Sequence, residues 1–276
     1  MNPIAKRTLT ALSVAAVVIA ALVYIPFAYL RPVLIALVAL VHLEFSQIVA
    51  KKHEIMIWPG VALGLGYLLV GFYAPNAVNY IPPVAAVFTL LAFAALFSRV
   101  ERPLVALGTT TLGFLYIPYM LRYFIALVDP SMPPPAGTCE SFWLLYTVAI
   151  VKISDMGGFA FGLGSKKLFG GNHKMCPSIS PGKSWEGLIG SVFGSCLIPS
   201  LFMPLTGFGF AKSLALGVTA ALVGTLGDLV ESRFKREAGV KDSSTMKLTN
   251  GMGGFLDMFD SLVFAPAVIW VLIRVI

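Results

Sequence analysis

The sequence GDLVESRFKREAGVKDSSTMKLTNGMGGFLDMFD, residues 227–260, contains the last long polar interruption in a chain of apolar runs. Asp228 and Glu231 open this interruption directly after an apolar run, and Asp257 and Asp260 close it before the run SLVFAPAVIW. Carboxylates are the ligands of hard divalent cations, and basic side chains bind phosphate. The stretch therefore predicts a site for phosphate and a divalent metal ion at the inner ends of two helices. The cations between the carboxylates are Arg233, Lys235, Arg236, Lys241 and Lys247.

Apolar residues dominate the rest of the chain. Of its 276 residues, 58% are hydrophobic and 12% are charged, and the mean hydropathy is +0.86. Apolar runs long enough to cross ~30 Å of hydrocarbon recur along the whole sequence, which leaves no room for a separate soluble domain. We expect an all-α, polytopic integral-membrane unit, with the N-terminal helices in residues 1–140 and the site-bearing helices in residues 141–276.

Hydropathy predicts nine membrane helices. The first apolar run follows Lys6 and Arg7, but it is longer than the apolar core of a signal peptide, so we expect it to be a retained helix. The three cysteines, Cys139, Cys176 and Cys196, have the spacing of neither a disulfide framework nor a metal site. The predicted spans are residues 8–30, 32–50, 55–73, 79–98, 103–128, 141–163, 184–205, 211–231 and 255–275.

The basic residues alternate between the loops as the positive-inside rule requires. The predicted outer segments hold only Arg31, Lys212 and Arg274. This distribution predicts a cytoplasmic N-terminus, a polar cavity open to the cytoplasm, and a location in the inner (plasma) membrane of the cell. The net charge of +7 is mostly this inward bias, and nothing in it indicates nucleic-acid binding. The predicted inner segments hold Lys6, Arg7, Lys51, Lys52, Arg99, Arg102, Lys166, Lys167, Lys174, Lys183 and the five cations given above.

A second polar segment, ISPGKSWEG, covers residues 179–187. Ser184 can cap the following helix, with Glu186 in its first turn, and this leaves Lys183 beside the helix N-terminus. Helix-end amides and an ammonium group can converge on a phosphate, although a capped helix with an ordinary loop lysine fits the pattern too. Asp155 lies in the sixth predicted span, within the glycine-rich sequence SDMGGFAFGLGSKKLFGG.

These motifs, in this order, resemble the signature of the phosphatidate cytidylyltransferase (CDP-diglyceride synthase) family. The resemblance rests on GD-L-x-E-S-x-x-K-R, the following KD, GG-F-L-D-x-x-D, the upstream ISP-x-K-S-W-E-G, and the stretch around Asp155. It is close over about residues 150–265 and agrees elsewhere in hydropathy. It implies transfer of a cytidylyl group from CTP to phosphatidate, which gives CDP-diacylglycerol and pyrophosphate.

The resemblance also implies roles for individual residues. Asp228, Asp257 and Asp260 would hold the metal centre, with Mg²⁺ and a monovalent cation such as K⁺, and Lys235 and Arg236 would be catalytic. CTP, a lipid phosphate and membrane lipids are the implied partners, and a homodimer is left open. The substrate-binding positions of the resemblance are Asp155, Lys183, Glu186, Ser232, Lys241, Asp242, Gly253 and Gly254.

The chain departs from the family pattern in the loop before the last helix. Asn250 and Met252 replace the proline and histidine of the usual PGHGG sequence, Met258 replaces the arginine of DRxD, and the loop is longer. Three alternatives therefore remain beside the leading function: another lipid phosphate as acceptor, a catalytically silent membrane protein, and a transporter. Internal repeats with broken helices, typical of transporters, are not visible in the sequence.

Overall fold

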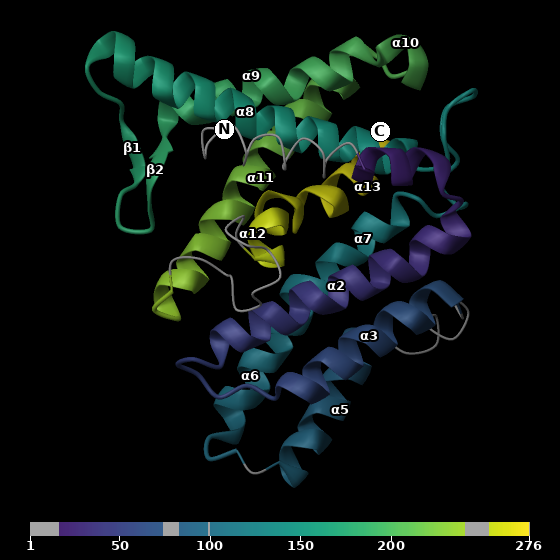
Figure 1. Ribbon diagram of the computed structural model, residues 1–276, viewed down its shortest axis with the longest axis vertical. Coiled ribbons are helices and arrows are strands. Elements are labelled where there is room, and N and C mark those ends of the chain that lie inside the picture. Colours follow the sequence, from purple (N-terminus) through teal and green to yellow (C-terminus); the bar gives the residue numbers. More distant parts are fainter. Residues whose placement is uncertain (1–16, 74–82, 99, 241–253, 276) are drawn as a thin grey trace, which may run out of the picture.

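The computed structural model describes residues 17–73, 83–98, 100–240 and 254–275. The first half of the chain forms a group of apolar helices that lies at one end of the molecule (Figure 1). Helix α2 is the longest of these and crosses the group diagonally beside α3. The elements are α2 (Phe27–Val49), α3 (Ile57–Tyr73), α5 (Pro83–Phe97), α6 (Pro103–Phe114), the π-helical turn η1 (Leu115–Tyr119) and α7 (Met120–Ala126).

The second half begins with a long helix, α8, which packs along α9 at the opposite end of the molecule (Figure 1). An antiparallel hairpin of two short strands joins these helices and projects from the helical body. The elements are α8 (Phe142–Phe169), β1 (Lys174–Cys176), β2 (Ser180–Ser184), α9 (Trp185–Leu201), α10 (Met203–Thr206), α11 (Phe210–Glu237), α12 (Phe255–Phe259), the 3₁₀ turn η3 (Asp260–Leu262) and α13 (Ala265–Val275).

The expectation of a helical membrane protein is confirmed. Within the described residues, five helical segments are long and apolar enough to cross a membrane, and α3 and α5 are shorter apolar helices. The number of nine crossings and their orientation stay predictions, since the first predicted span lies partly outside the described residues. The five segments are Phe27–Val49, Pro103–Ala126, Phe142–Leu168, Phe210–Glu237 and Phe255–Val275.

Prolines set several of the helix boundaries that hydropathy misplaces. The predicted first span runs through Pro26 to residue 30, whereas the structure starts α2 at Phe27, with Pro26 at the cap position. The predicted last span is broken into α12, η3 and α13, and Pro266 lies in the first turn of α13. Proline lacks an N–H group and is tolerated in a first turn, where that group would have no intrahelical partner. Pro118 lies in the π-helical turn between α6 and α7.

Glycines allow α8 and α9 to pack with their backbones in contact. A methyl group added at Gly194 would lie 2.6 Å from the carbonyl oxygen of Ile153, and one at Gly157 would overlap the carbonyl of Gly190. Small residues bring membrane helices close in this way. The contact brings Ser154, the neighbour of Asp155 on α8, within 3.2 Å of the carbonyl oxygen of Ser191 in the middle of α9.

An aromatic cluster joins the two halves of the molecule. The ring of Tyr116 lies 5.3 Å from that of Phe45 and 5.3 Å from that of Phe234, and Phe45 and Phe234 are 5.8 Å apart. Phe264 adds a fourth ring, 5.6 Å from Tyr116. Aromatic rings at these centroid distances attract one another, and this attraction adds to the stabilisation from burying their apolar surface. The cluster therefore fixes α2 and η1 against α11 near its charged end.

Candidate active site

Helix α11 presents a row of polar side chains near its C-terminal end. Glu231 and Ser232 lie three and four residues after Asp228 and four and three residues before Lys235, so the four side chains share one face of the helix. Ser232 Oγ donates a weak hydrogen bond of 3.4 Å to Asp228 Oδ1. The close packing of η3 on this helix depends on Gly227, where a side chain would meet the carbonyl oxygen of Asp260 at 2.7 Å.

Three carboxylates converge where α11 meets η3. One oxygen from each of Asp228, Glu231 and Asp260 lies within 4.8 Å of the others. Glu231 is 1% exposed, and its Oε2 pairs with the ammonium group of Lys235 at 3.1 Å. Such oxygen ligands are the donors that Mg²⁺ and other hard cations take. The residues present therefore fit a divalent metal ion.

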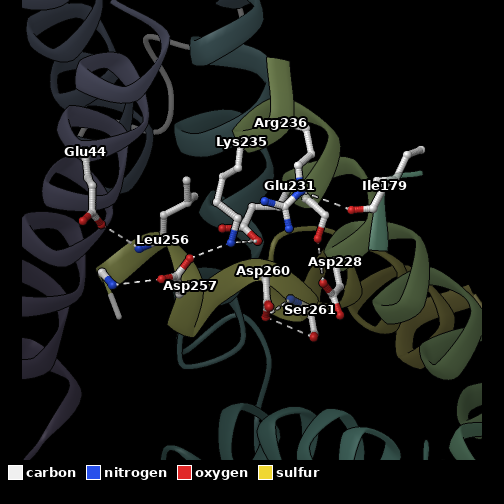
Figure 2. Close-up of polar contacts among 12 residues, drawn as sticks. Glu44, Ile179, Asp228, Glu231, Lys235, Arg236, Leu256, Asp257, Asp260 and Ser261 are labelled. Atoms are coloured by element: carbon white, nitrogen blue, oxygen red, sulfur yellow. Dashed lines mark hydrogen bonds and ion pairs between the residues drawn. The ribbon is translucent and has the colours of Figure 1, made fainter. Parts of the chain in front are cut away.

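Asp257 lies beside this cluster, in the first turn of α12. Its Oδ1 accepts a 2.8 Å hydrogen bond from Lys235, and its Oδ2 accepts one of 3.0 Å from the backbone N–H of Gly254 (Figure 2). Lys235 is thus held between Glu231 and Asp257. Among the described residues, the group of converging carboxylates includes Glu231 and does not include Asp257.

Strand β2 and the first turn of α9 supply the other side of the site. Lys183 forms an ion pair with Asp228, and both side chains are partly buried. Ser184 caps α9 as expected, because its hydroxyl accepts a 3.1 Å hydrogen bond from the N–H of Gly187. Glu186 turns toward His173 instead, with 2.6 Å between Oε1 and Nδ1. The Nε of Arg236 lies 3.4 Å from the carbonyl oxygen of Ile179, at the tip of the hairpin.

A polar cavity of about 300 Å³ lies between these elements. Asp155 reaches it from α8, where its Oδ1 accepts a 3.3 Å hydrogen bond from Ser261 and its Oδ2 lies 3.5 Å from Lys152. The lining residues that carry charges or hydroxyls are Asp155, Ser180, Lys183, Ser184, Ser191, Thr225, Asp228, Asp260 and Ser261.

The structure thus brings together Asp155, Lys183, Asp228 and Asp260 of the predicted site, with Lys235 and Asp257 adjoining them. Gly254 lies at the start of α12. Glu186 does not line the cavity. Lys241, Asp242 and Gly253 lie outside the described residues, as do the altered positions Asn250 and Met252.

The sequence placed Glu231 in the predicted phosphate and metal site through its three-residue spacing from Asp228, but the metal ligands implied by the resemblance did not include it. Ser191, Thr225 and Ser261 were assigned no site role. The hydroxyl residues carry no such signal, because serine and threonine are common at contacts between membrane helices.

Comparison with known proteins agrees with the motifs. The model of the family described as "Cytidylyltransferase family" matches residues 5–276. The chain belongs to the cytidylyltransferase family. Its predicted resemblance is therefore confirmed, and with its span-length helices it is a multi-pass membrane protein.

Curated relatives carry the name phosphatidate cytidylyltransferase. One from Staphylococcus haemolyticus is 31% identical over 94% of this chain and 94% of its own length. One from Staphylococcus aureus is 44% identical over 124 residues, which are 44% of this chain and 45% of that protein. One from Haemophilus influenzae is 40% identical over 45% of this chain and 43% of its own length.

Proposed function

We propose that the protein transfers the cytidylyl group of CTP to phosphatidate, which yields CDP-diacylglycerol and pyrophosphate. The observation that carries this proposal is the convergence of Asp228, Glu231 and Asp260, with Lys183 and Lys235 beside them, next to a polar cavity among apolar helices. A phosphate-transfer site at such a place suits one water-soluble and one membrane-bound substrate. The name of the relatives is consistent with this reaction.

The reaction needs positioning and charge neutralisation rather than a protein nucleophile. An oxygen of the lipid phosphate attacks the α-phosphorus of CTP, and the bond between that phosphorus and the oxygen bridging to the β-phosphate breaks. Pyrophosphate leaves with the electron pair. A phosphate monoester dianion is already nucleophilic, so no general base is required. Lys183, Lys235 and Arg236 supply positive charge for the phosphate oxygens.

Mg²⁺ is part of the proposal, with Asp228, Glu231 and Asp260 as the residues that would hold it. When bound, a divalent ion neutralises phosphate oxygens and favours attack at phosphorus. The further prediction that Asp257 ligates the metal, and that a monovalent cation such as K⁺ binds nearby, remains part of the same proposal. So does the assignment of Lys241, Asp242 and Gly253 to substrate binding.

We further propose nine crossings of the inner (plasma) membrane, with the N-terminus and the cavity on the cytoplasmic side. The support is the distribution of charge. The cavity lies beside the hairpin and the end of α11, which carry Lys174, Lys183, Lys235 and Arg236. Basic residues of this kind favour the cytoplasmic side. Membrane lipids are then direct neighbours, and assembly into a homodimer stays open.

The proposal is tested with the purified protein in detergent, supplied with CTP labelled at the α-phosphate, Mg²⁺ and phosphatidate. We expect label in CDP-diacylglycerol and release of one pyrophosphate per product. Diacylglycerol, which lacks the attacking phosphate, is the matched control acceptor. Labelling of another lipid phosphate in preference to phosphatidate would identify a different acceptor, and no labelling of any lipid at any Mg²⁺ concentration would favour the silent-protein alternative.

A further inference from the structure

Glu44 is a carboxylate buried far from the sequence motifs. It lies on α2, in the first half of the chain, and it is 0% exposed. Its Oε2 accepts a 2.8 Å hydrogen bond from the backbone N–H of Leu256, which is 212 residues away. Figure 2 shows the Glu44 side chain extending from α2 to the start of α12. An ionisable group inside an apolar helix is costly, so such a contact indicates a specific role.

The contact falls on the turn that carries the site carboxylates. The first N–H groups of a helix have no intrahelical partners, and Glu44 satisfies one of them in α12. The next residue is Asp257, which binds Lys235 and thereby adjoins Glu231. Asp260 follows within one turn, at the start of η3.

Helix α2 also contacts α11, and it does so at the residue next to Glu44. Phe45, adjacent to Glu44, packs on Phe234, which is adjacent to Lys235. Neighbouring residues of α2 thus contact both segments that bear the site: Glu44 contacts α12, and Phe45 contacts α11. A shift of either contact would change the distance between the carboxylates of α11 and those of α12 and η3.

We infer that Glu44 is a positioning residue of this active site: its hydrogen bond to Leu256 sets the first turn of α12, and so places Asp257 and Asp260 against α11. The inference rests on the proposed function. Of the described residues, those that line the cavity do not include Glu44, so it acts through α12 and not by touching a substrate.

The test uses substitutions that separate the acceptor atom from the charge. Glu44→Leu removes the acceptor, and Glu44→Gln keeps an amide oxygen that can accept the same hydrogen bond. Glu140→Leu is the matched control, because Glu140 also accepts a 2.8 Å hydrogen bond from a backbone N–H, that of Phe27, at the other end of α2. Turnover, the KM for each substrate, and Mn²⁺ affinity by electron paramagnetic resonance without substrates are measured for each.

We expect Glu44→Leu to lower kcat by about tenfold or more and to weaken Mn²⁺ binding, because small displacements of reacting groups have effects of this size. The KM for phosphatidate should change less. Glu44→Gln should stay within about threefold of wild type in both readouts, and Glu140→Leu should match wild type. If Glu44→Leu cannot be isolated folded, Glu44→Asp, one methylene shorter, replaces it with the same expectation.

The inference is overturned if Glu44→Leu, or Glu44→Asp in its place, keeps wild-type kcat and Mn²⁺ affinity. It is equally overturned if Glu44→Gln is as impaired as Glu44→Leu, or if Glu140→Leu shows the same loss. An inactive wild type would instead count against the proposed reaction, and the Mn²⁺ measurements would still judge the positioning role.

Discussion

Lys235 connects the two sets of carboxylates in the site. Its ammonium group lies 3.1 Å from Glu231 and 2.8 Å from Asp257, and its side chain is only 13% exposed. A buried charge whose partner is removed is left without compensation, which typically costs about 3 to 5 kcal/mol. Lys235 therefore contributes to the stability of the fold, in addition to its proposed role in binding phosphate.

The first prediction concerns this ion-paired lysine. Lys235→Met should lower the free energy of unfolding by about 3 kcal/mol or more, since Glu231 then keeps a buried charge without its cation. The double variant Lys235→Met, Glu231→Gln should recover a large part of that loss, because it removes both charges. Unfolding in mixed micelles, titrated with sodium dodecyl sulfate, measures the difference. Equal stability of the single and double variants would contradict this prediction.

A second prediction separates the carboxylates by role. Asp228→Asn and Asp260→Asn should each weaken Mn²⁺ binding by about 10- to 100-fold and abolish most turnover, because an amide is a poor ligand for a hard cation. Asp257→Asn should also reduce turnover, but with a smaller effect on Mn²⁺ affinity, since Lys235 occupies its Oδ1. Asp129→Asn is the control, because Asp129 is distant in sequence from the site carboxylates and forms an ion pair with Arg31 instead.

Equal loss of Mn²⁺ affinity in Asp257→Asn and Asp228→Asn would show that Asp257 binds the metal as strongly as Asp228, and unchanged affinity in Asp257→Asn would remove Asp257 from the metal ligands. Near-normal turnover of all three variants at low Mg²⁺ would remove the carboxylates from the mechanism.

Residue types and local spacing were enough to find Asp228, Asp260, Lys183 and Lys235. Carboxylates in apolar sequence are rare, so each one is informative. The ion pair of Lys183 with Asp228 and the contact of Glu44 with Leu256 could not be predicted in this way. They depend on how distant helices pack, and local sequence spacing does not determine that packing.

At the scale of the elements, hydropathy located the apolar segments but did not locate their breaks. Residues 255–275 read as one span, while the structure turns at η3 and restarts at α13. That break moves Asp260 out of a regular helix and toward α11. The glycine-rich sequence of α8 is typical of close helix packing, but the partner helix, α9, became evident only in the structure.

A third prediction tests that packing. Gly194→Ala places a methyl group 2.6 Å from the carbonyl oxygen of Ile153 and should force α8 and α9 apart. Overpacking of this kind costs about 1 to 3 kcal/mol. It should also lower turnover, because Asp155 lies on α8 and Lys183 lies on β2, the strand that leads directly into α9. The same detergent titration, together with the transfer assay, measures both effects.

Gly164→Ala, on the partner helix α8, is the control, since no other segment of the described residues comes within 4 Å of the added methyl group. Alanine is a better helix former by about 0.5 to 1 kcal/mol, so this variant should be as stable as wild type or slightly more stable. Equal behaviour of the two variants would mean that the α8–α9 contact tolerates a wider separation.

At the scale of the whole molecule, the proposed orientation places the loop before α8 outside and the hairpin after it inside. The fourth prediction uses cysteines that the chain already has: Cys139 in that loop and Cys176 on β1, both partly exposed and free. In sealed right-side-out vesicles, an impermeant maleimide should label a variant that keeps only Cys139. A variant that keeps only Cys176 should be labelled after the vesicles are opened.

Removing the other two cysteines should leave activity unchanged, and a variant without any cysteine is the background control. Labelling of Cys176 in sealed vesicles, or of both cysteines from the same side, would contradict the proposed orientation.

The hydrogen bond between Glu44 and Leu256 has a consequence for biogenesis. At 5 to 20 residues per second, the ribosome needs about 10 to 40 s to synthesise the 212 residues that separate the two. During that interval α2 has entered the membrane while its amide partner does not yet exist. The nascent protein must therefore tolerate the Glu44 carboxyl group in α2 before the N–H of Leu256 is available. A chain that stops before α12 never forms this hydrogen bond.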